Sequence, residues 1–193
     1  MDKNTNFELL FETALRHLYH AEHDIRDNLA VMIQSASATE LKDAFAAHKQ
    51  ETQGQIERLE KVFQLLGIDL RKSKTQGITD ATEKGIEMLK TLADMNFTDR
   101  SKGIEGILNE GKELIRHFAG KEAGDLALTS AAKKVEHFEI ACYEFVCFLA
   151  EHYGYQEVLS LLQANLEEEK RANETFSHLA RTSVQLPAAL VAK

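Results

Sequence analysis

The strongest constraint on the fold is a helical spacing of apolar residues in four long segments. Apolar side chains recur at alternating three- and four-residue steps across residues 5–34, 40–66, 122–153 and 156–182. This spacing is typical of a helix that buries one face. The single proline, Pro187, lies beyond the last segment, so none of the four has to kink. No segment shows the alternation of a strand, and the pattern predicts an all-α protein.

The lengths of the connections indicate how the helices are joined. Short connections should make antiparallel hairpins of the first two and the last two segments, with Ser37 or Thr39 as cap of the second helix. Gly67 and Gly154 follow two of the segments, where glycine commonly ends a helix. About 55 residues separate the hairpins and include weaker helical segments at 79–95 and 101–118. Two hairpins joined by one long crossover predict a ferritin-like antiparallel four-helix bundle.

The chain of 193 residues fits one domain. We expect a bundle over residues 1–182, with the crossover at about 68–120, and a C-terminal tail over 183–193. The apolar residues of the tail favour a homodimer.

Charge and composition exclude several classes of protein. The net charge is −8 with the acids spread along the chain, which argues against a nucleic-acid partner. No apolar run approaches the ~18 residues of a membrane span, and the N-terminus lacks a signal-peptide pattern. We therefore expect a cytoplasmic protein. Cys142 and Cys147 lie five apart on one predicted helix, too far apart to bridge.

Polar residues interrupt the apolar stripe of every long helix near its middle. Glu22 interrupts the first helix, and His48, with Glu51 one turn on, interrupts the second. Glu139 and Glu169 interrupt the third and the fourth. Antiparallel hairpins bring mid-helix positions to the same level, so these side chains are expected to converge inside the bundle.

Four buried carboxylates repel one another and are costly to desolvate. They would have to share protons, open to a water-filled cleft or bind cations. Two divalent ions would neutralise four carboxylates, and oxygen ligands with an imidazole suit iron or manganese. The same composition fits a hydrogen-bonded network that fixes helix register without metal.

Further residues belong to this hypothesis. Glu136 shares a helix face with Glu139 and is a further ligand candidate. Glu168 is the register alternative to Glu169. The central carboxylates of the second and fourth helices, Glu51 and Glu169, are expected to bridge the ions. Tyr19, one turn before Glu22, is a candidate hydrogen-bond partner of a ligand.

Several motifs resemble those of the YciE/YciF family of ferritin-like bacterial stress proteins. They are LYHAE (18–22), ELKDAFAAHKQETQGQIERLEKVFQLLG (40–67), VEHFEIACY (135–143) and LEEEKRANE (166–174). The resemblance implies a ferritin-like bundle with a dinuclear metal site and a role in stress response. Residues 73–100 look like extra sequence relative to the family pattern.

One departure from ferritin-like proteins concerns the Glu-x-x-His motif. Gly54 stands three residues after Glu51, and Ala172 stands three residues after Glu169. The ligand set is therefore richer in carboxylates than a standard di-iron site.

The leading hypothesis is a stress protein that binds two divalent metal ions, with iron preferred over manganese, at Glu22, His48, Glu51, Glu136, Glu139 and Glu169. A small oxidant such as oxygen or peroxide would react there, and whether the protein is an enzyme stays open. The alternatives are a non-enzymatic helical protein with a buried polar network and a manganese catalase-like enzyme.

Overall fold

The computed structural model describes residues 3–70, 100–121 and 123–182, with side chains from residue 7 onward. All regular secondary structure in these ranges is helical: α1 (Lys3–Ser35), α2 (Thr39–Leu65), α5 (Lys102–Phe118), α6 (Gly124–His152) and α7 (Gln156–Thr182). Each helix begins and ends within two residues of the bounds expected from the sequence. The expected helical segment at 79–95 lies outside the described residues.

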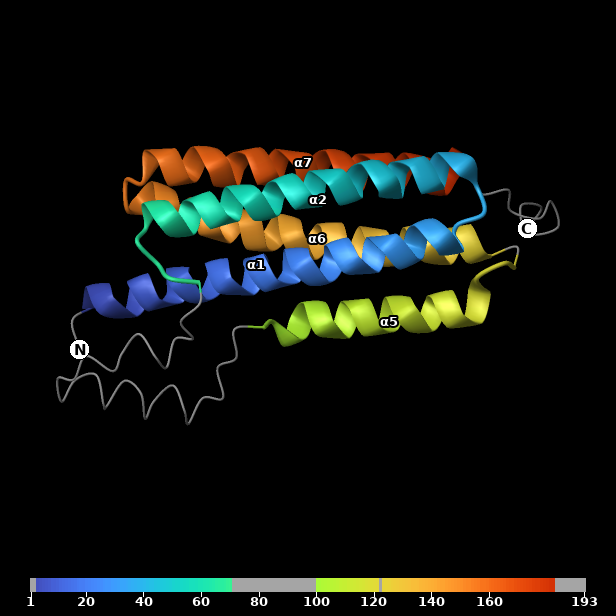
Figure 1. Cartoon of the computed structure of the whole chain (residues 1–193), viewed down its shortest axis with the longest axis horizontal. Coiled ribbons are helices and arrows are strands. Elements are labelled where there is room, and N and C mark those ends of the chain that lie inside the picture. Colours follow the sequence, from blue (N-terminus) through green and yellow to red (C-terminus); the bar gives the residue numbers. More distant parts are fainter. Residues whose placement is uncertain (1–2, 71–99, 122, 183–193) are drawn as a thin grey trace, which may run out of the picture.

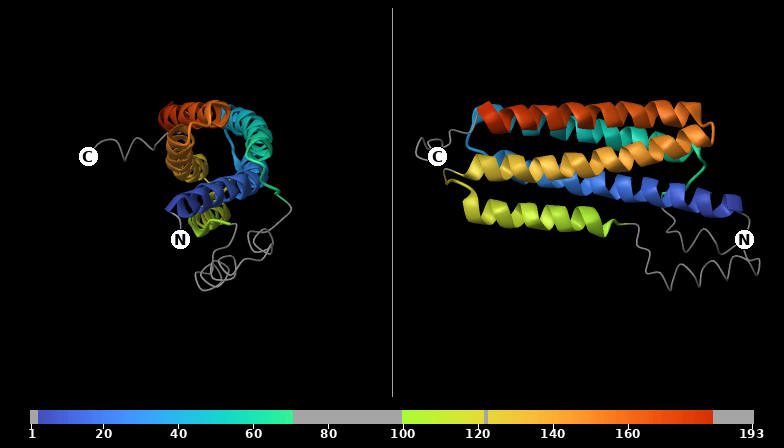
Figure 2. Two further views of the ribbon diagram at one scale, coloured as in Figure 1. Left: turned by 90° about the vertical axis from the view of Figure 1, so that its left-hand side faces the viewer. Right: turned by 180° about the vertical axis from the view of Figure 1, so that it is seen from behind.

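Four of the helices form an antiparallel bundle (Figure 1). The hairpins α1–α2 and α6–α7 lie side by side, so that α2 packs on α7 and α1 packs on α6. Helix α5 lies outside this square and packs on α6 and α1 (Figure 2). It runs back along the bundle as the last part of the crossover, which confirms the expected two hairpins with one long crossover.

Two glycines end helices as the sequence predicts. Gly67 and Gly154 have φ angles of 69° and 72°, in the left-handed region that costs glycine little and other residues more. Both let the chain leave its helix in a tight turn.

The start of α2 differs from expectation. Neither Ser37 nor Thr39 caps this helix, because the cap position is Ala38, which has no capping side chain. Instead the backbone amides of Ser37 and Ala38 donate to the two carboxylate oxygens of Asp125, at 2.7 and 2.8 Å. A residue at the start of α6 thus holds the α1–α2 turn.

The buried interior consists of two apolar clusters with a polar layer between them. The α6–α7-turn cluster includes Leu15, Leu18, Leu59, Phe63, Tyr143 and Leu162. The α1–α2-turn cluster includes Ile25, Leu29, Phe45, Leu128, Val135 and Phe176. The polar layer consists of the buried side chains of Glu22 on α1, His48 on α2, Glu136 and Glu139 on α6 and Glu169 on α7. These are five of the six expected ligands.

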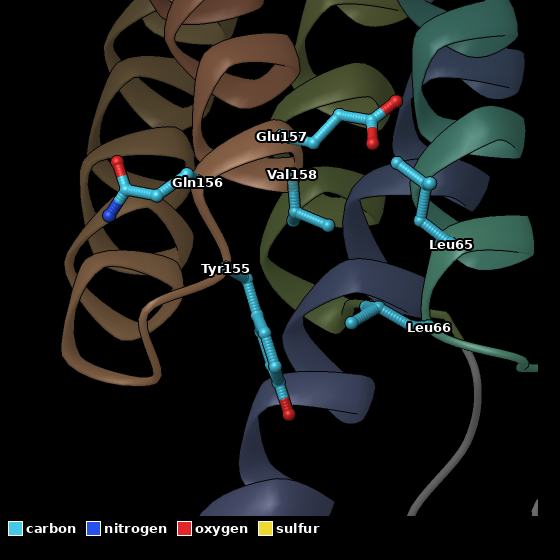
Figure 3. Close-up of a pocket in the computed structure, with 6 residues that line it drawn as sticks. All are labelled: Leu65, Leu66, Tyr155, Gln156, Glu157 and Val158. Carbon is cyan, nitrogen blue, oxygen red and sulfur yellow. The ribbon is translucent and has the colours of Figure 1, made fainter.

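A hollow of about 320 Å³ opens at the end of the bundle near the α6–α7 turn. Figure 3 shows the six residues that line it, from Leu65 and Leu66 on α2 to Tyr155, Gln156, Glu157 and Val158. Its only carboxylate, Glu157, is exposed, and none of the lining residues belongs to the polar layer. The hollow is therefore separate from the candidate metal centre.

Two further expectations concern the chain as a whole. Both cysteines are free thiols, as predicted, and burial raises the pKa of each to about 11. Within the described ranges, no helix combines the length and the apolar character needed to cross a bilayer.

Candidate metal centre

The polar layer brings four ligand candidates together from three helices. His48 of α2, Glu136 and Glu139 of α6 and Glu169 of α7 each offer one ligand atom, and these four atoms lie within 4.8 Å of one another. All four side chains are buried, with at most 3% of their surface exposed. A nitrogen and three carboxylate oxygens at this spacing have the composition and size of a site for a divalent cation.

Glu22 of α1 lies beside this group and is fully buried. Its Oε1 accepts a hydrogen bond from the Tyr143 hydroxyl, and its Oε2 has no hydrogen-bond partner. Burial raises the pKa of Glu22 to about 8, although the Tyr143 hydrogen bond acts in the opposite direction. The first helix thus contributes its expected carboxylate to the layer.

His48 lies between two carboxylates. Its Nε2 is 3.2 Å from Oε1 of Glu136, inside the bundle, and its Nδ1 is 3.6 Å from Oε2 of Glu51. Burial alone would lower the pKa of His48, but the neighbouring carboxylates of Glu136 and Glu51 outweigh it and raise the pKa well above its usual value. The imidazole is therefore held between an inner and an outer acid.

Glu51 does not join the buried group. Its side chain is 42% exposed, and the neighbouring His48 imidazole lowers its pKa. Of the six ligand candidates, it is the one that solvent reaches most readily.

Buried carboxylate oxygens without hydrogen bonds are the most unusual feature of the layer. Among the residues that the structure describes, both oxygens of Glu139 lack a hydrogen-bond partner, as does Oε2 of Glu22, Glu136 and Glu169. A buried acceptor left unsatisfied costs ~1–3 kcal/mol. Burial first, and neighbouring charges second, raise the pKa of Glu139 and of Glu169 well above the usual range. Without a cation, both groups therefore tend to hold a proton.

The remaining oxygens are held by a polar network that the sequence analysis did not assign to the site. The side-chain amide of Gln55 donates to Oε1 of Glu169. Nδ2 of Asn165 donates to the Tyr143 hydroxyl at 2.9 Å, and Oδ1 of Asn165 accepts from Nε of Arg58. Nδ2 of Asn165 also donates to the backbone carbonyl of Gln55 at 3.4 Å. The network therefore joins Glu22 and Glu169 to the half-buried Arg58.

On α7, Glu169 enters the layer as expected, whereas its register alternative Glu168 pairs with the Arg58 guanidinium at the edge of the bundle. The expectation for Tyr19 meets a different structure. The Tyr19 hydroxyl donates to Glu60, 3.2 Å away, and Tyr143 takes the role foreseen for Tyr19. Tyr143 stands one helical turn after Glu139, a spacing that would have marked it.

The residues of the layer could hold a divalent metal ion. Five buried oxygens lack partners in the described part of the chain, and they face the same layer as the His48 imidazole. Hard oxygen donors with one nitrogen suit iron and manganese. The donors come from all four helices of the bundle.

A four-helix bundle with one long crossover and a mid-level layer of acids and histidine is the arrangement of ferritin-like proteins. The chain belongs to the family described as "Domain of unknown function (DUF892)", whose model matches residues 6–101 and 80–189. This family membership confirms the resemblance found in the sequence.

Named relatives agree with this assignment. Protein YciF of Escherichia coli (strain K12) is 33% identical over 177 residues, which are 92% of each chain. The crystal structure of the E. coli stress protein YciF superposes with a TM-score of 0.72 at 31% identity, covering 93% of this chain and 96% of that one. YcfI from Rhodopseudomonas palustris gives a TM-score of 0.71 at 31% identity, covering 89% and 92%.

Proposed function

We propose that this protein binds two divalent metal ions, iron in preference to manganese, in the polar layer and acts in a bacterial stress response. The observation that carries the proposal is the set of five partnerless carboxylate oxygens buried beside His48. Cations would satisfy these oxygens and neutralise the acids that otherwise repel one another. The stress role rests on the similarity to the E. coli stress protein YciF.

The partnerless oxygens suggest a role for each ligand. Glu139 offers two such oxygens, whereas Glu22, Glu136 and Glu169 each offer one. These four carboxylates would hold the ions, with His48 as the nitrogen ligand.

Bound iron would supply one-electron redox chemistry toward oxygen or peroxide. The chain itself prepares the ligands for a cation. Tyr143 and Gln55 fix the orientation of Glu22 and Glu169 by hydrogen bonds. Apolar clusters on both sides of the layer keep water from the ligands. A protonated His48 imidazole carries a hydrogen on both ring nitrogens. One of these protons must leave before that nitrogen can bind metal.

Metal content tests the proposal. Untagged protein is loaded anaerobically with ferrous iron, desalted and measured by elemental analysis, beside a Glu139→Gln/Glu169→Gln variant and a control, Glu174→Gln, altered at an exposed acid of the same helix as Glu169. About two ions per chain in the unmodified protein and in the control, lost in the double variant, are expected. Equal metal in all three proteins would contradict the site.

A metal-free structural role is the second candidate. The network of Tyr143, Asn165 and Arg58 would fix helix register without any ion. In that case a chelator would leave the thermal midpoint unchanged, whereas removal of a bound metal lowers it. Manganese in the protein together with peroxide turnover would instead favour a catalase-like enzyme.

A further inference from the structure

One acid among the six ligand candidates differs from the others in its access to solvent. Glu51 is 42% exposed, whereas Glu22, Glu136, Glu139 and Glu169 are at most 1% exposed. A hydrated cation in solution can meet Glu51 without any movement of the bundle, but it cannot meet the buried four.

Buried side chains lie on both sides of the polar layer along the bundle. On one side are Leu166 and Tyr143 of the α6–α7-turn cluster, and Tyr143 also belongs to the polar network. On the other side, Phe176 packs against the His48 ring with centroids 5.8 Å apart, and Phe45 packs against Phe176 at 5.2 Å. This packing favours entry of a cation from the side, between helices.

His48 connects Glu51 to the buried acids. Its Nδ1 lies 3.6 Å from Oε2 of Glu51, and its Nε2 lies 3.2 Å from Oε1 of Glu136. Glu136 in turn belongs to the group that shares a ligand site with Glu139 and Glu169. Donor atoms thus follow one another from solvent to the centre of the layer, with no apolar side chain between them.

The charges of two arginines, Arg171 and Arg58, act on Glu51. Of these, Arg58 is held by Asn165 and Glu168. Gly54, one turn along α2, has no side chain, and a Cβ placed there would meet no atom closer than 3.6 Å, on Arg58. Arg171 on α7 is exposed, and Glu51 is the acid beside His48 at this surface.

We propose that Glu51 is the loading carboxylate of the metal centre: it captures divalent cations from solvent and passes them through His48 to the buried acids. This inference rests on the proposed metal site and concerns the rate at which that site fills. It assigns to Glu51 a transient role in place of a permanent bridging role.

The test measures loading rate and affinity separately. Cobalt(II), whose visible absorption reports its ligands, is mixed with the full-length protein by stopped flow and titrated at equilibrium. Glu51→Gln is compared with the unmodified protein and with Glu57→Gln, a control at an exposed acid of the same helix. Glu51→Asp keeps the charge and serves as the rescue variant.

For Glu51→Gln we expect a loading rate at least about tenfold slower, an order typical of lost electrostatic capture, with the final stoichiometry unchanged. The loading rate should also depend less on salt concentration than in the unmodified protein. Glu57→Gln should load normally, and Glu51→Asp should recover most of the rate.

Three results would overturn the inference, and they are distinguishable. An unchanged loading rate in Glu51→Gln would show that cations enter elsewhere. A loss of one ion per chain at equilibrium would make Glu51 a permanent ligand. No cobalt binding by the unmodified protein would remove the metal site itself, and the loading role with it.

Discussion

The α6–α7-turn cluster and the polar layer are neighbouring regions built on the same four helices, yet burial affects stability differently in the two. In the cluster, buried residues such as Leu59 and Phe63 pack together and gain stability from burial alone. In the layer, Glu139 is equally buried but has no hydrogen-bond partner for either oxygen. The comparison indicates that the cluster stabilises the fold, whereas the layer lowers the stability of the metal-free fold.

The largest effect is expected in the cluster. Phe63 is 1% exposed and packs edge-on against Tyr19 with centroids 5.7 Å apart. Phe63→Ala should lower the free energy of unfolding by about 3–5 kcal/mol, because it removes apolar contacts and leaves a cavity. The free energy of unfolding is measured by urea denaturation with and without divalent metal. The control Phe148→Ala, at a side chain 62% exposed, should change stability by less than ~0.5 kcal/mol.

The layer should respond in the opposite direction. Glu139→Leu replaces a partnerless buried acid by an apolar side chain and should raise the free energy of unfolding of the metal-free protein by about 1–4 kcal/mol at pH 8. It should also abolish any stabilisation by metal. The matched control, Glu144→Leu, changes an exposed acid of the same helix. A destabilised Glu139→Leu protein would show that the acid supports the fold directly.

The pH dependence of the metal-free protein sharpens the same contrast. The folded-state pKa values of Glu22 (about 8), Glu139 and Glu169 lie above the usual value of a carboxyl, and that of His48 lies above the usual value of an imidazole. The folded state therefore holds more protons than the unfolded state. Stability should fall as pH rises from about 5 to about 8, measured as the urea midpoint. A midpoint that rises over this range would contradict the burial of these groups as acids.

The smallest effect distinguishes two tyrosines. Tyr143→Phe leaves Glu22 Oε1 and the Asn165 amide without their partner in a buried site, and should cost about 1–3 kcal/mol. Tyr19→Phe removes a half-buried hydrogen bond to Glu60 and should cost ~0.5–1.5 kcal/mol. Only the first should weaken cobalt affinity. Equal effects of both variants on affinity would exclude a specific role of Tyr143 in holding Glu22.

The sequence predicted the helices well because their signal is periodic and long. Five helix spans and the order of the hairpins follow from apolar spacing and the two terminating glycines. The convergence of His48, Glu136, Glu139 and Glu169 also follows, since mid-helix positions of antiparallel hairpins share a level.

The errors concern contacts between helices, which periodicity does not encode. Cys142 and Tyr143 are neighbours on α6, and apolar spacing does not decide which of them faces the interior. In the structure Tyr143 is buried more deeply than Cys142. Its hydroxyl can therefore donate to Glu22, the contact expected of Tyr19. Asn165 and Gln55 could have been predicted, because each is a buried polar residue on the layer-facing side of its helix. The hydrogen bonds between the start of α2 and Asp125 could not be predicted, since Asp125 is distant in sequence.

The Asp125 contact has a consequence for how the chain folds. The turn of the first hairpin obtains its hydrogen bonds from a residue 88 positions away, at the beginning of the second hairpin. The first hairpin is then not a self-contained folding unit, because the α1–α2 turn is completed only when α6 has docked. The two halves should therefore unfold together in one cooperative transition, and a fragment that ends before α6 should lose the ordered start of α2.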